Sequence, residues 1–126
     1  DFKRMGGPGK GIWELHDAEI ATIDIGSWKS PAFASERTPL LSDVLAICKN
    51  RSGVLIELKY YGHDQRLEER VVEIVEAAGM THQVRVMSLS HAGVRKVQQL
   101  RPGWKFGLLG TGFFRAYLPF VLIRLH

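Results

Sequence analysis

Two side chains of opposite charge lie in one short apolar segment, Val54-Leu55-Ile56-Glu57-Leu58-Lys59. Its β-branched and aliphatic residues predict a strand, and successive side chains of a strand alternate between its two faces. Glu57 and Lys59 therefore share one face with Leu55. A charged group that leaves water is costly unless it is paired or bound to a metal ion. A carboxylate and an ammonium at the end of such a strand thus indicate a site rather than a core position.

The segments around this strand alternate between helix and strand. A helix is expected to open at Pro39, and a second to run from about Gln65 to Ala78, with Gly79 as its end. A second strand is predicted over 84–89, followed by a helix capped by Ser90 and a third strand over 105–109. This order is typical of a parallel α/β fold. Three strands are too few to close a barrel of eight.

Residues 1–38 predict loops rather than a repeat of this pattern. The Gly-rich stretch at 1–12 matches neither phosphate-binding glycine motif, so we interpret it as a connecting loop. A short helix is expected between Trp13 and Gly26. The segment 26–35 is aromatic but interrupted by Gly and Pro, which is typical of an ordered Ω-loop or lid.

Composition narrows the class of protein but does not identify a function. The chain has 126 residues, 45% of them hydrophobic, which is enough for one modest domain. Its net charge of +4 is scattered, so we do not expect a nucleic-acid partner. The single cysteine, Cys48, excludes an internal disulfide. No segment approaches the roughly 20 apolar residues of a transmembrane span.

In combination, several short motifs resemble the glycerophosphodiester phosphodiesterase family, and more closely its bacterial branch with an attached membrane domain. The resemblance covers roughly residues 1–110, and each motif alone would be weak. The matching residues are Gly26-Ser27-Trp28, Ser30-Pro31, Phe33-Ala34, Glu36-Arg37, Pro39, Leu41, Val44-Leu45, Ile56-Glu57-Leu58-Lys59, Val86-Met87-Ser88-Leu89, Arg101-Pro102, Trp104 and Gly107-Leu108-Leu109.

The resemblance implies an internal part of a TIM (β/α)8 barrel that lacks the first and last strands. It also implies hydrolysis of glycerophosphodiesters to glycerol 3-phosphate and an alcohol with a divalent cation. Glu57 would be a metal ligand, and its hard oxygen donors suit Mg²⁺ or Ca²⁺. Lys59 would bind the substrate phosphate. The alternative is that Glu57 and Lys59 form a structural ion pair or are two solvated charges.

The family's acid and base motifs, His-Arg-Gly and His-Asp, and its Glu-x-Asp motif are not recognised in this chain. We therefore assign no catalytic residue, and we expect the chain to be inactive by itself. His16-Asp17 falls at a predicted helix start and is not taken as the catalytic pair. His63 and His91 are expected at the surface.

These observations predict one incomplete catalytic domain over 1–126. It comprises lid-like loops at 1–38, β/α repeats at 39–110 and a divergent tail at 111–126. The alternative function is a non-catalytic, barrel-derived module that binds a lipid headgroup or a protein partner through Trp28 and Phe33. The parent protein would be attached to a bacterial membrane, or otherwise cytoplasmic.

Overall fold

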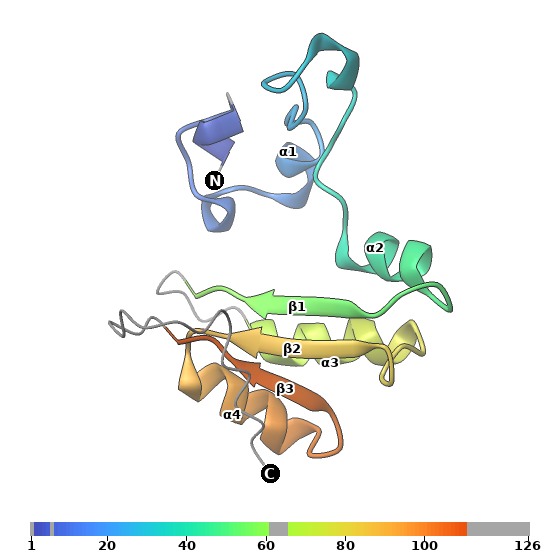
Figure 1. Ribbon diagram of the computed structural model, residues 1–126. Coiled ribbons are helices and arrows are strands. Elements are labelled where there is room, and N and C mark those ends of the chain that lie inside the picture. Colours follow the sequence, from blue (N-terminus) through green and yellow to red (C-terminus); the bar gives the residue numbers. More distant parts are fainter. Residues whose placement is uncertain (1, 6, 61–65, 111–126) are drawn as a thin grey trace, which may run out of the picture. The chain divides into compact units, whose positions relative to one another are not determined.

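The computed structural model describes residues 2–5, 7–60 and 66–110 (Figure 1). The chain divides into two compact units, residues 1–40 and 41–126, and each is described by itself. His63 and the predicted tail at 111–126 lie outside the described residues. That the chain forms one domain stays a prediction.

The first unit consists of short helical turns joined by loops. Its 3-10 helices are Phe2–Met5, Ile12–Glu14 and Pro31–Phe33, and its one α-helix in the described part is α1, Asp17–Ile20. The helix expected between residues 13 and 26 is thus much shorter than that interval. The hydroxyl of Thr22 donates a hydrogen bond to the carbonyl of Glu19 (2.8 Å), which competes with continuation of the helix.

Residues 24–37 form a loop that is closed by its own hydrogen bonds and contains the aromatic segment 26–35. The amide of Ile25 donates to the carbonyl of Glu36 (3.2 Å), which joins the two ends of the loop. The indole N–H of Trp28 donates to the carbonyl of Ile25 (2.7 Å). Gly26 allows this closure because a Cβ there would lie 2.0 Å from the carbonyl oxygen of Phe33.

The second unit contains a parallel sheet in the order β1-β2-β3. Its strands are β1 (Val54–Leu58), β2 (Val84–Ser88) and β3 (Lys105–Leu108), within the ranges predicted from the sequence. Leu58 pairs with Ser88, and Ser88 with Leu108, so the carboxyl ends of the strands lie at one edge of the sheet. The α/β class and the parallel sheet are confirmed.

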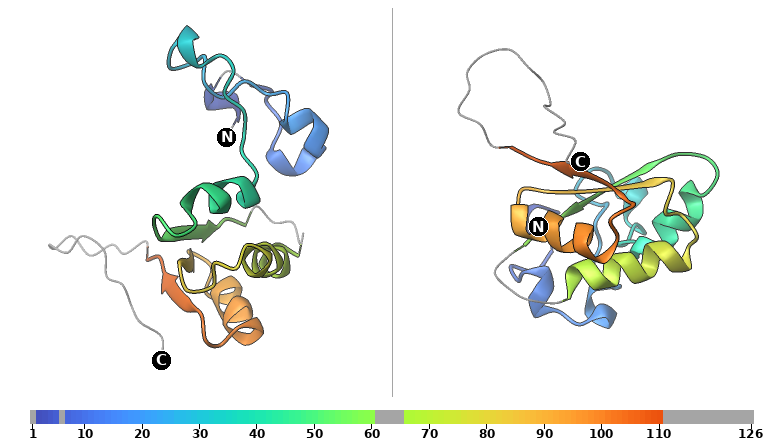
Figure 2. Two further views of the ribbon diagram at one scale, coloured as in Figure 1. Left: turned by 90° about the vertical axis from the view of Figure 1, so that its right-hand side faces the viewer. Right: turned by 90° about the horizontal axis from the view of Figure 1, so that it is seen from below.

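Helices α2 (Leu41–Cys48), α3 (Leu67–Ala77) and α4 (His91–Leu100) alternate with the strands. Helices α3 and α4 lie on the same side of the sheet (Figure 2). The predicted ends are confirmed: Gly79 follows α3 with a φ of 64°, and the Ser90 hydroxyl accepts a hydrogen bond from the amide of Gly93 (3.2 Å) at the start of α4. Helix α2 begins at Leu41, two residues after Pro39.

One face of the sheet packs against these helices and the other does not. The buried core consists of Leu45, Leu58, Val71, Val72, Val75, Met80, Val84, Val86 and Val97. Strand alternation places Arg85 and Leu55 on the opposite face, where Leu55 is 56% exposed. Glu57 belongs to this second face, which we call the helix-free face. Neighbouring strands align two rows of residues across it: Leu55, Arg85 and Lys105 in one row, and Glu57, Met87 and Gly107 in the other.

No helix in the described ranges has the length and apolar content to cross a bilayer. Attachment of the parent protein to a membrane stays a prediction.

Candidate functional site at the carboxyl end of the sheet

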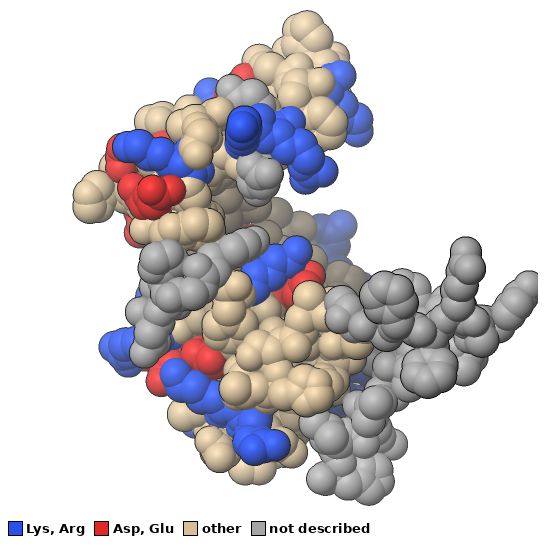
Figure 3. Space-filling model, turned by 90° about the vertical axis from the view of Figure 1, so that its left-hand side faces the viewer, with Lys and Arg blue, Asp and Glu red and all other residues tan. Residues whose placement is uncertain are grey.

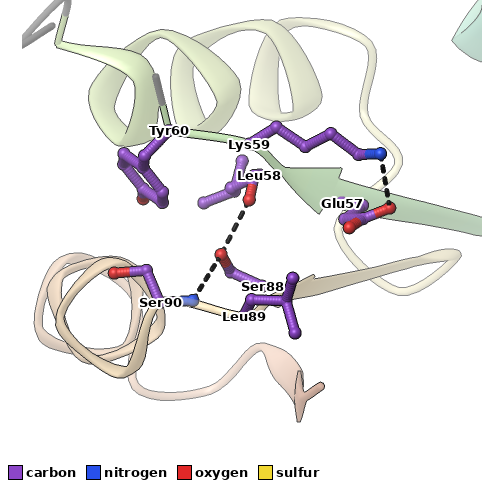
Figure 4. Close-up of a pocket in the computed structure, with 7 residues that line it drawn as sticks. All are labelled: Glu57, Leu58, Lys59, Tyr60, Ser88, Leu89 and Ser90. Carbon is purple, nitrogen blue, oxygen red and sulfur yellow. Dashed lines mark hydrogen bonds and ion pairs between the residues drawn. The ribbon is translucent and has the colours of Figure 1, made fainter. Parts of the chain in front are cut away.

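Glu57 and Lys59 lie together at the carboxyl end of β1. The carboxylate Oε2 of Glu57 is 3.5 Å from the ammonium Nζ of Lys59 (Figure 4). The Lys59 side chain is 59% exposed and that of Glu57 30%. The ion pair of the alternative interpretation is therefore present.

Because this ion pair is exposed, it stabilises the fold too little to account for the presence of both charged residues. An exposed pair contributes about 0–1 kcal/mol, because water screens the charges and both side chains lose freedom. Such a pair can exchange its partners for a ligand at small cost. The geometry is thus compatible with a site in which Glu57 and Lys59 bind different groups.

A hollow of about 410 Å³ lies beside this pair. It is lined by residues from the ends of β1 and β2 and from the start of α4: Glu57, Leu58, Lys59, Tyr60, Ser88, Leu89 and Ser90 (Figure 4). The carboxyl ends of neighbouring parallel strands are where α/β proteins bind ligands. The structure thus brings Glu57 and Lys59, the two residues predicted from the sequence, to one ligand-sized hollow.

Ser88 joins the ends of two strands below the hollow. It is 1% exposed, and its hydroxyl donates to the carbonyl of Leu58 (2.7 Å) and accepts from the amide of Ser90 (3.0 Å). Its own carbonyl accepts from the amide of Leu109 (2.9 Å). The family resemblance included Ser88, but sequence reasoning gave it no role. A hydroxyl residue at the end of an apolar strand was the available signal.

Tyr60 is a second residue of the hollow that sequence reasoning placed only in a loop. Its hydroxyl donates to the Glu68 carboxylate of α3 (2.7 Å). No sequence pattern linked these two side chains.

Two of the histidines that the structure describes, His16 and His91, lie at helix starts. His16 immediately precedes α1 in the first unit, where its amide donates to the Glu19 carboxylate (2.8 Å). His91 is the first residue of α4 and is exposed. Neither lines the hollow.

Among the residues that the structure describes, no group of three or more His, Cys, Asp or Glu side chains could hold a metal ion. Glu57 offers carboxylate oxygens at the rim of the hollow, which suit one ligand position for a hard cation. The described residues therefore fit one ligand of a metal site and not a complete one.

In Figure 3, blue Lys and Arg side chains and red Asp and Glu side chains are both exposed on each of the two units.

Comparisons with known proteins agree with this fold and with the motifs. No family model matches the chain. A Bacillus subtilis (strain 168) protein, YhdW, provisionally named a glycerophosphodiester phosphodiesterase, is 30% identical over 110 residues, which are 81% of this chain and 45% of YhdW.

Two solved structures share the fold. A glycerophosphodiester phosphodiesterase from Agrobacterium tumefaciens str. C58 matches with a TM-score of 0.64 and 28% identity over 73% of this chain and 38% of its own. A provisionally named one from Galdieria sulphuraria matches with a TM-score of 0.66 over 79% of this chain and 39% of its own; at 19% identity, this match shows the fold alone.

The fold and the site define a β/α-repeat protein with its charged residues at the carboxyl end of a parallel sheet. Within that class, the resemblance to the glycerophosphodiester phosphodiesterase family is confirmed. The chain spans less than half the length of the relatives it matches.

Proposed function

We propose that this chain is part of a protein that hydrolyses glycerophosphodiesters to glycerol 3-phosphate and an alcohol, with a divalent cation as cofactor. The observation that carries the proposal is the joint position of Glu57 and Lys59 beside the hollow, in a chain related to this family. The proposed site needs an anion-binding group and a cation-binding group within reach of one phosphate. Lys59 and Glu57 supply one of each.

We further propose that the sheet is part of a (β/α)8 barrel. Successive strands lie side by side in chain order, and α3 and α4 cover one face only, as in a barrel wall. The helix-free face would then be the inner one. The side chain of Glu57 would project toward the barrel interior at the carboxyl end of the strands, which is where barrel enzymes place their chemistry.

In this proposal, Lys59 binds the phosphate of the substrate. Its side chain is more than half exposed, and its ammonium forms the weak pair with Glu57. A phosphate oxygen can replace that partner, and a lysine acts on it as a point charge.

Glu57 would be one ligand of Mg²⁺ or Ca²⁺, and the bound cation would polarise a phosphoryl oxygen. The other ligands, the general acid and the general base are not assigned to residues of this chain. The chain by itself is therefore expected to be inactive, and activity is to be tested on the product of the complete reading frame that contains it.

The test compares two substitutions in that complete protein. Glu57→Gln removes a charged metal ligand and should lower kcat/KM for glycerophosphocholine by more than about a hundredfold. Substituting residues that only hydrogen-bond to a metal ligand already lowers metal affinity or activity by about 10–100-fold. Lys59→Met removes a charge-assisted contact to the phosphate and should raise KM about tenfold. Arg95→Met, on the exposed face of α4, serves as the control. Wild-type turnover by Glu57→Gln would overturn the assignment.

The second candidate, a module that binds a lipid headgroup or a partner, rests on the loop of residues 24–37. There Trp28 is 57% exposed and Phe33 41%. Under this alternative, phosphatidylcholine vesicles should shift the fluorescence of a variant that keeps Trp28 alone. A spectrum that vesicles leave unchanged would remove this candidate.

A further inference from the structure

The chain leaves the sheet at Lys59 and Tyr60, beyond the last pair of the β1–β2 ladder, Leu58 with Ser88. Neither residue is held by that ladder. Successive side chains of an extended segment point to opposite sides. In Figure 4 the Lys59 side chain extends toward Glu57, whereas the Tyr60 ring extends elsewhere, toward the α4 side of the hollow. Because Tyr60 directly follows Lys59, the contacts of Tyr60 constrain the backbone from which the Lys59 side chain extends.

Tyr60 is held by a buried carboxylate. Glu68, on α3, is only 5% exposed, and its Oε1 accepts the hydrogen bond of the Tyr60 hydroxyl at 2.7 Å. Its Oε2 lies 3.2 Å from the ammonium of Lys96 on α4, which also lies 3.1 Å from Glu69. Both oxygens of the buried carboxylate thus have a partner, as a buried charge requires. Glu68 thus links its own helix, α3, to the end of β1 and to α4.

Tyr60 and Lys96 both keep the protons with which they contact Glu68. Burial, followed by the hydrogen bond and the charge of Glu68, raises the pKa of the Tyr60 phenol, so the hydroxyl stays a donor. Hydrogen bonds to Glu69 and Glu68 raise the pKa of Lys96, so its ammonium stays charged.

Helix α4 provides the space for the ring. Gly93 is buried, and a Cβ there would lie 2.0 Å from the Tyr60 hydroxyl oxygen and 2.5 Å from the ring carbon that bears it. The ring therefore occupies the volume that a side chain at residue 93 would need. Gly93 and Glu68 together fix the ring from two helices.

We infer that Tyr60 is a positioning residue: held by Glu68 and seated against Gly93, it directs the preceding Lys59 toward the phosphate of the substrate. This inference rests on the proposed function. Because the hydroxyl of Tyr60 is engaged with Glu68, the residue acts through Lys59 and not on the substrate.

The test uses the product of the complete reading frame and glycerophosphocholine as substrate. Tyr60→Phe keeps the ring but removes the hydrogen bond, and should raise KM about fivefold, while kcat changes less than twofold. Glu68→Leu should have the same effect. Glu68→Gln retains an amide oxygen that can accept from Tyr60, and should bring KM back toward the wild-type value.

A control separates positioning from loss of stability. Glu76→Gln weakens a second link between α3 and the end of α4, the two-fold contact of Glu76 with Arg101, which lines no part of the hollow. It should lower the unfolding midpoint and leave KM unchanged. If Tyr60→Phe fails to fold, the comparison of Glu68→Gln with Glu68→Leu decides.

The outcomes distinguish the two claims. If Lys59→Met raises KM and the Tyr60 and Glu68 variants do not, the positioning role is wrong and the proposed function stands. If neither Lys59→Met nor Glu57→Gln has any effect, the proposed function fails, and the positioning role fails with it.

Discussion

At the residue scale, Gly93 is required for space. A Cβ at residue 93 would lie 2.0 Å from the Tyr60 hydroxyl oxygen, which donates to Glu68, so this hydrogen-bonded group would have to shift. Gly93→Ala should therefore lower the free energy of unfolding by about 1–3 kcal/mol, the usual cost of overpacking. Urea denaturation of the product of the complete reading frame, followed by circular dichroism, measures it.

Gly103→Ala is the matched control, because a Cβ there would meet nothing within 4 Å. The double variant Tyr60→Ala/Gly93→Ala should lose less stability than the sum of the single variants, since the first change removes the ring that the second one meets. Equal losses for Gly93→Ala and Gly103→Ala would show that the close approach of Tyr60 has no energetic weight.

At the element scale, the loop of residues 24–37 depends on the charge of Asp24. Its carboxylate accepts hydrogen bonds from the amides of Gly26 (2.8 Å) and Ser27 (2.9 Å) and from the Ser27 hydroxyl. The Ser27 hydroxyl, then these amides, lower the pKa of Asp24 from 3.8 to about 2. A lowered folded-state pKa stabilises the folded state above the unfolded value, and this contribution is lost as the pH falls through the folded one.

The loop should therefore loosen as the pH falls from about 4 to about 2. Trp28 reports on it, because its indole N–H bonds to Ile25 within the loop. In a Trp13→Phe/Trp104→Phe background, Trp28 fluorescence should change over this range. Asp24→Asn keeps an acceptor without a titrating charge and should remove that step; an identical acid transition in both proteins would refute the role of Asp24.

Sequence periodicity predicted the elements of the second unit well, because its helices and strands follow apolar repeats of 3.6 and 2 residues. Gly79 and Ser90 mark helix ends through local chemistry that a sequence displays. The link from Tyr60 through Glu68 to Lys96 could not be predicted in this way. Its members come from three segments, and only the packing of α3 against α4 brings them together.

In the candidate site, too, residues that are conspicuous within one segment could be predicted, and contacts between segments could not. Glu57 and Lys59 were predicted because a charge in an apolar strand is visible in one segment. The hydrogen bond by which Ser88 joins the ends of β1 and β2 depends on the pairing of Ser88 with Leu58, and a sequence does not display that pairing.

At the scale of the whole molecule, the described sheet has one helix-free face and an unpaired outer edge on each of β1 and β3. Parallel sheets are normally covered on both faces, and open edges pair with other chains. The 126-residue chain should therefore self-associate, as light scattering at increasing concentration would show.

Leu55→Lys places a charge on the helix-free face and should reduce this association. Ile47→Lys, at an apolar position on α2 that is 66% exposed against 56% for Leu55, should reduce it less. A monodisperse monomer that unfolds cooperatively would refute the prediction.

The central claim is that the end of β1, with Glu57 and Lys59, belongs to a metal-dependent phosphodiesterase. The most direct test follows glycerophosphocholine by ³¹P nuclear magnetic resonance in the presence of the product of the complete reading frame. We expect the phosphodiester signal to be replaced by that of glycerol 3-phosphate with Mg²⁺ or Ca²⁺, and to persist with excess chelator or in the Glu57→Gln variant. Hydrolysis that continues unchanged with chelator and in that variant, or no hydrolysis with either cation, would contradict the account.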